Sequence, residues 1–230
     1  AYMNVYSETH TAVRASEWIN DNVRKSTLVL KEHWEEGLPG LHAYRLNELP
    51  MYDPDGPQKL DILSEELANA ETLVFFSNRL YGTLPRIPER YPASTAYYEL
   101  LFSGRLGYEL AEYEATYPSL FGVSFVHDTF SRPGLPEPEP LDDFRPSAIP
   151  INLGHADESF SVYDHPTVLV FRNVKSYDAE TVSKLVDAET APRPPVIGAP
   201  EGPVLTEDEF ATQREGGTWT DIFSPDRWTS

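Results

Sequence analysis

Apolar positions in the first part of the chain form two kinds of pattern. In 9–23 and 58–70 they recur every three or four residues, which predicts two amphipathic helices. Each predicted helix is followed by a short, almost wholly apolar run, at 26–30 and 72–76, of the kind that forms strands buried on both faces. Helices that alternate with such strands predict a parallel sheet with right-handed crossovers.

The remaining pattern extends this arrangement. We expect a helix over 94–102 that ends at Gly104, a strand over 106–113, an edge segment over 117–126, two strands within 157–172, and a helix over 178–189. Residues 41–57 are expected to be irregular because prolines and a glycine interrupt them. The predicted fold is α/β, with a three-layer, mostly parallel, Rossmann-like sheet and helices on both faces.

Composition divides the chain into parts. We expect 1–8 to be an N-terminal linker, 9–189 the α/β domain, and 190–230 a linker and C-terminal tail. Within the domain, 132–150 is rich in proline and is interpreted as an irregular, stiff surface insertion. The chain has no obvious natural boundaries, so we interpret it as a segment of a longer protein.

Charge narrows the choice of partners. The formal net charge of −19 argues against nucleic acid or an anionic lipid surface held by a general electrostatic field. Cysteine is absent, which excludes disulfides, a thiolate nucleophile and cysteine-based metal sites. The six histidines lack metal-ligand spacing, so no metal and no cofactor is expected.

The first candidate site follows the strand predicted at 26–30. Glu32, Trp34 and Glu35 come directly after it, within Lys31-Glu-His-Trp-Glu-Glu-Gly-Leu-Pro39. Carboxylates beside an aromatic ring are typical of sugar sites, where the ring stacks on the sugar and the carboxylates bind its hydroxyls. An exposed strand-to-loop turn of an acidic protein would contain the same residues, and spacing alone does not separate the two interpretations.

The second candidate site follows the strand predicted at 72–76. The loop from Ser77 to Tyr91 carries Asn78, Arg79, Tyr81 and Arg86. Loops at the carboxyl ends of strands are where ligands bind in open α/β sheets. The arginines are dense for so acidic a chain, and guanidinium groups bind phosphate through paired contacts, although they could equally pair with the acidic surface.

With these segments in view, the chain resembles the extracytoplasmic domain of the YYY family of polytopic membrane proteins. Four segments carry the resemblance: Glu32 to Pro39, Ser77 to Pro92, Tyr97-Tyr-Glu-Leu-Leu-Phe-Ser-Gly104, and Glu158-Ser-Phe-Ser-Val-Tyr-Asp-His-Pro166. The tail Gly217-Thr-Trp-Thr-Asp-Ile-Phe223 is also similar to the approach to a membrane helix. The family comprises bacterial and archaeal relatives of membrane glycosyltransferases that use lipid-phosphate sugars.

The resemblance implies a membrane-anchored domain on the extracytoplasmic face, with 1–8 and 190–230 leading from and to membrane segments. Its partners would be the membrane part of its own polypeptide and a glycan or lipid-phosphate sugar. We expect an accessory domain of the cell envelope that helps to bind this ligand and is not catalytic alone. No residue is assigned a catalytic role, and the substrate-binding candidates are Glu32, Trp34, Glu35, Asn78, Arg79, Tyr81 and Arg86.

Two other classes of function stay open at this point. The chain could be an interaction or assembly module of a membrane complex that binds no glycan. It could also be a free-standing hydrolase that uses Glu32, Glu35 or Glu36, although no motif fixes a second carboxylate opposite the first. Asp164 beside His165 invites an acid–base interpretation, but a turn at Asp164-His165-Pro166 is the favoured one.

Overall fold

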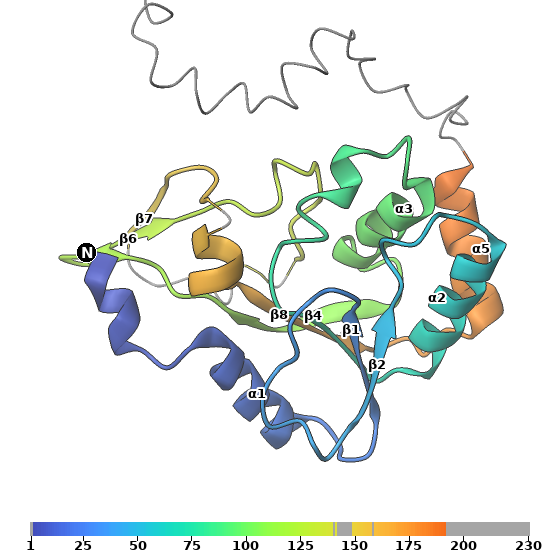
Figure 1. Cartoon of the computed structure of the whole chain (residues 1–230), viewed down its shortest axis with the longest axis horizontal. Helices are drawn as coiled ribbons and strands as arrows, with labels where there is room; N and C mark the ends of the chain where they lie inside the picture. Colours follow the sequence, from blue (N-terminus) through green and yellow to red (C-terminus); the bar gives the residue numbers. More distant parts are fainter. Residues whose placement is uncertain (1, 140, 142–148, 158, 192–230) are drawn as a thin grey trace, which may run out of the picture. The chain divides into compact units, whose positions relative to one another are not determined.

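The computed structural model describes residues 2–139, 141, 149–157 and 159–191 (Figure 1). Most of the tail predicted over 190–230 and most of 140–148 in the proline-rich insertion therefore lie outside the described residues. The described part contains two β-sheets with helices around the larger one. None of its helices combines the length and the apolar character needed to cross a membrane.

The larger sheet has five strands. Their order is β2 (Arg45–Leu49), β1 (Leu28–Glu32), β3 (Thr72–Phe75), β8 (Val168–Asn173) and β4 (Tyr108–Glu114). β1 pairs in parallel with both β2 and β3, whereas β8 pairs antiparallel with both β3 and β4. Four strands therefore run in one direction, and β8 runs against them.

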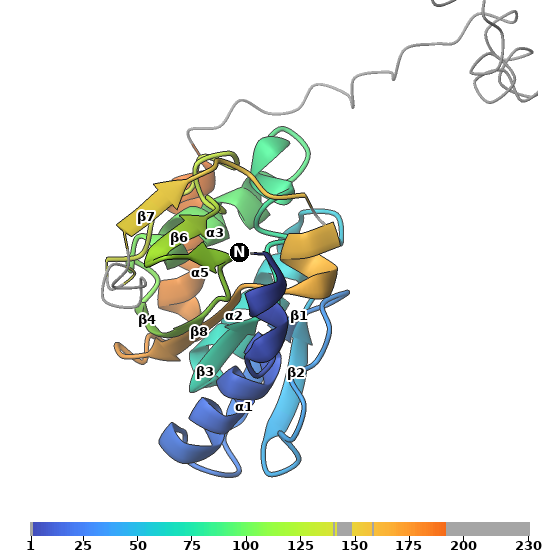
Figure 2. The ribbon, with the colours of Figure 1, turned by 90° about the vertical axis from the view of Figure 1, so that its left-hand side faces the viewer.

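Alternate side chains of the central strands are buried on opposite faces of this sheet. Val29, Val74 and Val170 pack with Ile19 of α1 (Thr11–Asn22) on one face. The other face packs against α2 (Pro57–Asn69), α3 (Pro92–Phe102) and α5 (Ala179–Thr190). Figures 1 and 2 show α1 apart from these three helices, on the other side of the strands. Burial on both faces explains why the strand sequences are almost wholly apolar.

Local sequence signals fix where the helices begin. α2 and α3 start with Pro57 and Pro92, whose ring suits the first helical turn because the amide hydrogen there has no intrahelical partner. α5 starts after Asp178, whose side chain accepts a hydrogen bond from the backbone N–H of Thr181 at 2.8 Å. The N-cap of α1 is His10, whose Nδ1 accepts from the N–H of Ala12 at 3.2 Å.

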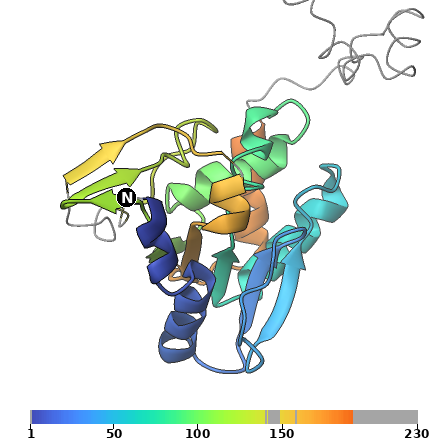
Figure 3. The same cartoon turned by 60° about the vertical axis from the view of Figure 1, so that its left-hand side comes forward.

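A smaller sheet follows β4. Its strands are β5 (Ser119–Leu120), β6 (Val123–Val126) and β7 (Ile149–Asn152), with β6 in the middle. Figure 3 shows these strands, in green and yellow, apart from the blue strands β1 and β2. The described residues also include 3-10 helices η1 (Tyr2–Ser7) and η2 (Leu84–Arg86) and a π-helical turn, η3 (Ser159–Asp164).

The α/β class predicted from the sequence is confirmed, with two corrections to its elements. The predicted irregular segment 41–57 contains the edge strand β2, and the first of the two strands predicted within 157–172 is instead the turn η3. The sheet is mixed because β8 enters it antiparallel. The predicted helices over 9–23, 58–70, 94–102 and 178–189 correspond to α1, α2, α3 and α5.

Candidate functional site

The two loops singled out from the sequence begin side by side. β1 ends at Glu32 and β3 ends at Phe75, and these parallel strands pair with Lys31 opposite Val74. The sheet continues to β2 on one side of β1 and to β3 on the other, which is the arrangement that opens a crevice at the carboxyl ends of strands. Both loops therefore emerge at this edge.

Glu35 joins the two loops. Its carboxylate accepts hydrogen bonds from the Ser77 hydroxyl, at 3.0 Å to one oxygen and 2.9 Å to the other. The residue is 5% exposed, and burial raises the pKa of Glu35 to about 7, although the Ser77 hydrogen bond and the charge of Arg79 act in the opposite direction. Lys31 Nζ also donates to the Glu35 carbonyl at 2.7 Å.

Glu32 lies deeper, with 0% of its surface exposed. The Tyr98 hydroxyl donates to Glu32 Oε1 at 2.7 Å, and Oε2 has no hydrogen-bond partner among the described residues. Burial raises the pKa of Glu32 well above its usual value, and the nearby Glu35 acts in the same direction. Glu32 is therefore an interior group in which burial favours the neutral carboxyl form, and it has no surface for a ligand.

Trp34 has the opposite environment. The residue is 65% exposed, and its backbone has a φ of 75°, in the left-handed region that few non-glycine residues adopt. Arg79 Nη1 donates to the Trp34 carbonyl at 2.8 Å, which fixes the first loop against the second. The guanidinium of Arg79 also lies 5.2 Å from the ring centre of Tyr163. The indole is therefore presented to solvent, on a loop whose backbone is held by an arginine.

Asn78, Arg79 and Arg86 line one small cavity of about 40 Å³. By the same measure a water molecule needs about 10–15 Å³, so the cavity has room for a group larger than one water. The Asn78 side-chain oxygen is buried and has no hydrogen-bond partner among the described residues. Arg86 is exposed and makes no ion pair with any described residue. These three residues, which were grouped from the sequence, therefore also lie together in the structure.

The turn that presents Asn78 depends on Gly82. The N–H of Gly82 donates to the Asn78 carbonyl at 2.8 Å. A Cβ at position 82 would lie 2.4 Å from that oxygen, closer than such atoms approach in proteins. The close approach of the two backbones therefore requires glycine.

Several cavity residues were not found from the sequence. The cavity is also lined by Arg132, His127, Asp128 and His155, which come from the proline-rich insertion and from the segments after β6 and β7. Burial lowers the pKa of His127 to about 4, so this imidazole is neutral. The Asp128 carboxylate accepts from the backbone N–H groups of Phe130 and Ser131, so its charge is engaged in a local turn. A basic residue in an insertion is a weak sequence signal, and nothing in 132–150 linked Arg132 to the loop after β3.

Tyr81 is a core residue. It is 0% exposed, and its ring packs on Phe75, Phe102 and Phe130 at centroid distances of 5.7, 5.2 and 6.0 Å. Its ring has no surface for a ligand, so it does not belong to the cavity that its neighbours form. Of the seven residues predicted to bind substrate, Trp34, Asn78, Arg79 and Arg86 are placed where a ligand could meet them.

The charges at this edge are suited to binding an anion. Three guanidinium groups, from Arg79, Arg86 and Arg132, surround a cavity to which one carboxylate contributes. In the described part of the chain, no group of three or more His, Asp and Glu side chains could hold a metal ion. Comparisons with models of protein families, with curated proteins and with solved structures found no match for this chain.

Proposed function

We propose that this chain is an extracytoplasmic accessory domain of a membrane glycosyltransferase-like protein, and that it binds a phosphate-bearing sugar without catalysing the transfer itself. The observation that carries the proposal is the cavity at the carboxyl edge, where Asn78, Arg79 and Arg86 converge with Arg132. An arginine cluster suits phosphate because each guanidinium offers paired donors in one plane. We also propose that the parallel part of the sheet, β2-β1-β3, is a Rossmann-like unit.

The exposed indole of Trp34 supports the sugar part of this proposal. Arg79 both lines the cavity and holds the Trp34 carbonyl, so one side chain links the anion cavity to the aromatic surface. A phosphate in the cavity would leave an attached sugar free to stack on a neighbouring ring. Stacking on an apolar sugar face and ion pairing to its phosphate would then act together.

The environments of the two carboxyl groups support a role other than catalysis. Glycoside hydrolysis needs two carboxyl groups that reach the substrate from opposite sides. Glu32 has no exposed surface and Glu35 is 5% exposed and hydrogen-bonded to Ser77. We therefore assign both to holding the two loops together and leave them out of the ligand contacts.

Binding of phosphates to the chain tests the proposal directly. Geranyl phosphate, a hexose 1-phosphate and inorganic phosphate would be titrated while amide NMR shifts are followed. Shifts at Asn78, Arg79 and Gly82 are expected. Arg86→Gln should weaken binding by about tenfold or more, as expected for a lost hydrogen bond to a charged group. Arg90→Gln is the matched control, because Arg90 is in the same loop but lines no part of the cavity.

The three phosphates separate the parts of the ligand. Tighter binding of the hexose phosphate than of inorganic phosphate, reduced by Trp34→Ala, would support the sugar contact. If none of them shifts the loop amides, or if Arg86→Gln and Arg90→Gln have equal effects, the ligand-binding proposal is wrong.

A second candidate function, an assembly module, is favoured by the face of the smaller sheet. Phe121 is 96% exposed at the β5–β6 turn, and Leu120, Ile149, Ile151 and Leu153 are also exposed. Leu120 pairs with Val123, and Val123 pairs with Ile149, so these apolar side chains form a row across the three strands. Exposed apolar surface of this kind often marks a contact with another protein.

The assembly role has its own test in the full-length membrane protein. Phe121→Ser combined with Ile149→Ser should release the domain from its partner, measured by cross-linking, and should leave phosphate binding unchanged. Unchanged cross-linking would remove this candidate.

A further inference from the structure

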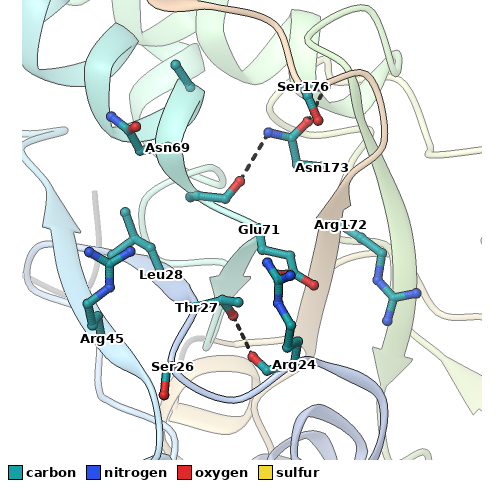
Figure 4. A pocket seen from close by; sticks show the side chains of 12 residues that line it. Arg24, Ser26, Thr27, Leu28, Arg45, Asn69, Glu71, Arg172, Asn173 and Ser176 are labelled. Carbon is teal, nitrogen blue, oxygen red and sulfur yellow. Dashed lines mark hydrogen bonds and ion pairs between the residues drawn. The ribbon is translucent and has the colours of Figure 1, made fainter.

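A larger cavity, of about 560 Å³, lies at the other edge of the five-stranded sheet (Figure 4). It is formed where β1, β2 and β3 begin and where β8 ends. Its charged lining residues are Arg24, Arg45, Glu71 and Arg172. This volume is within the range of small-molecule sites, about 300–1,000 Å³. Because β1 and β3 run from this edge to the carboxyl edge, the two cavities are separate.

The lining carries an excess of positive charge. Arg24 forms one ion pair with Glu71, at 3.5 Å, whereas the side chain of Arg45 has no hydrogen bond or ion pair with any described residue. Figure 4 shows Arg24 and Arg45 on opposite sides of Leu28 and Thr27, with Glu71 beside Arg24. Three guanidinium groups against one carboxylate is the reverse of the charge balance of the whole chain, which is −19.

Arg172 is already fixed in place at the rim. Its Nη2 donates to the Asn22 carbonyl at 2.9 Å, and its guanidinium lies 5.4 Å from the ring centre of Trp18. Because its side chain is already held, Arg172 adds positive charge to the cavity, and the binding of a ligand would not reduce its conformational freedom. Arg24 and Arg45 are the groups whose donors can turn towards a ligand.

The polar groups around the cavity are held by short local hydrogen bonds. Thr27 Oγ1 donates to the Arg24 carbonyl at 2.8 Å. Asn173 Nδ2 donates to the Ala70 carbonyl at 3.0 Å, and Asn173 Oδ1 accepts from the Ser176 N–H at 2.8 Å. These bonds keep the floor of the cavity in one geometry before any ligand arrives.

Two lining residues have unusual backbone geometry. Ser26 has a φ of 66° and Ser176 a φ of 51°, both in the left-handed region. Residues held in this region cost free energy and are found preferentially at ligand-binding segments. Their presence on two separate loops around one cavity supports the interpretation of this edge as a binding site.

We propose that this cavity is a second binding site, for a small anion that carries phosphate or carboxylate groups together with hydroxyls. The anionic groups would contact Arg24 and Arg45, and the hydroxyls would exchange hydrogen bonds with Ser26, Asn69 and Ser176, which also line the cavity. The lining contains no aromatic ring and few apolar side chains, so an apolar ligand does not fit it. The site is independent of the phosphate-bearing sugar proposed for the carboxyl edge.

The test uses two probes on the full chain, pyrophosphate and galacturonate, with galactose as the uncharged control. Amide NMR shifts should appear at Ser26, Thr27, Glu71 and Asn173, saturate with concentration, and decrease with added salt because the contacts are electrostatic. Comparison of the two probes shows whether phosphate or carboxylate is preferred. Galactose should cause no saturable shift.

Variants with opposite expected effects on binding make the test specific. Arg45→Gln should weaken binding by about tenfold, which corresponds to about 1.4 kcal/mol. Glu71→Gln should strengthen it, because the carboxylate that competes for Arg24 is removed. Arg105→Gln is the control, since it breaks an exposed ion pair with Glu189 away from the cavity.

The proposal is overturned if neither anion shifts these amides, or if Arg45→Gln and Arg105→Gln have the same effect. None of these variants should alter shifts at Asn78 or Gly82. The result is therefore separable from the outcome at the carboxyl edge.

Discussion

The hydroxyl of Ser77 lies within 3.0 Å of both carboxylate oxygens of Glu35, a residue 42 positions earlier in the chain. This contact joins the loop after β1 to the loop after β3. It also holds a carboxylate inside the protein, where ionisation is unfavourable. The geometry of the edge and the titration of Glu35 are therefore coupled.

The first prediction concerns pH. The pKa of Glu35 is about 7 in the folded chain, against an ordinary value of 4.5 for a glutamate side chain. Between these pH values the folded state retains a proton that the unfolded state has lost, so stability falls as pH rises through this range. At 1.36 kcal/mol per unit, the loss above pH 7 is about 3 kcal/mol. Glu32, whose pKa is also raised, acts in the same direction.

Urea denaturation between pH 4.5 and pH 8 measures this loss. Glu35→Gln should flatten the dependence of the unfolding free energy on pH. Glu36→Gln removes the same charge from an exposed neighbour and serves as the control. Equal pH slopes for the two variants would contradict the prediction.

The second prediction compares two adjacent tyrosines. Tyr98 and Tyr97 are both 0% exposed, but only Tyr98 has a hydrogen-bond partner among the described residues, the carboxyl group of Glu32. Tyr98→Phe should cost about 1–3 kcal/mol, because it leaves both oxygens of a buried carboxyl group without a partner. Tyr97→Phe should be neutral or slightly stabilising. Chemical denaturation of both variants checks this, and a larger loss for Tyr97→Phe would contradict it.

The third prediction concerns Gly82. A methyl group there would meet the Asn78 carbonyl, so Gly82→Ala should destabilise the chain by about 1–3 kcal/mol and weaken phosphate binding at the carboxyl edge. Gly37→Ala is the matched control, because a Cβ at position 37 would meet nothing within 4 Å. Thermal unfolding and the phosphate titration are the measurements. Similar behaviour of the two variants would show that the close approach is not needed.

The fourth prediction concerns a buried ammonium group. Lys59 is 5% exposed, and its three N–H groups are shared among four acceptors at 2.6–2.9 Å: the Met51 and Asp53 carbonyls, Asp55 Oδ1 and Ser94 Oγ. Lys59→Met should cost about 3–5 kcal/mol, because it leaves these acceptors, including a carboxylate, without their donor. Lys184→Met removes an exposed pair with Glu180 and should cost less than about 1 kcal/mol. Comparable losses in urea denaturation would contradict this assignment.

The sequence predicted the interior of the fold better than its edges. Val29, Val74 and their neighbours are apolar because they are buried on both faces, so pattern alone located β1 and β3. β2, with the sequence Arg-Leu-Asn-Glu-Leu, is an edge strand with four exposed residues, and it has no such pattern. Within 159–164, Phe160 and Val162 alternate as in a strand, but hydrogen bonds to Asp157 from Ser159 and Ser161 form a turn instead.

Part of the candidate site was also predictable, because the order of helices and strands determines which loops lie together. The carboxyl ends of adjacent parallel strands must meet, so the proximity of Glu35 to Ser77 follows from the order of helices and strands. Arg79 and Arg86 share the cavity with residues from the segments after β6 and β7. Long connections bring these segments back to this edge, and local sequence does not encode the path of those connections. The burial of Tyr81 was not foreseen because a tyrosine in a polar loop carries no sign of its surroundings.

The position of β8 has a consequence for the synthesis of this chain. β3 and β4 pair with β8 and not with each other, so the sheet stays in two pieces until residues 168–173 have left the ribosome. During that interval two strand edges are open to pairing with other chains. A nascent chain that stalls before residue 168 should therefore be a substrate for chaperones and proteases, even though its first three strands are already complete.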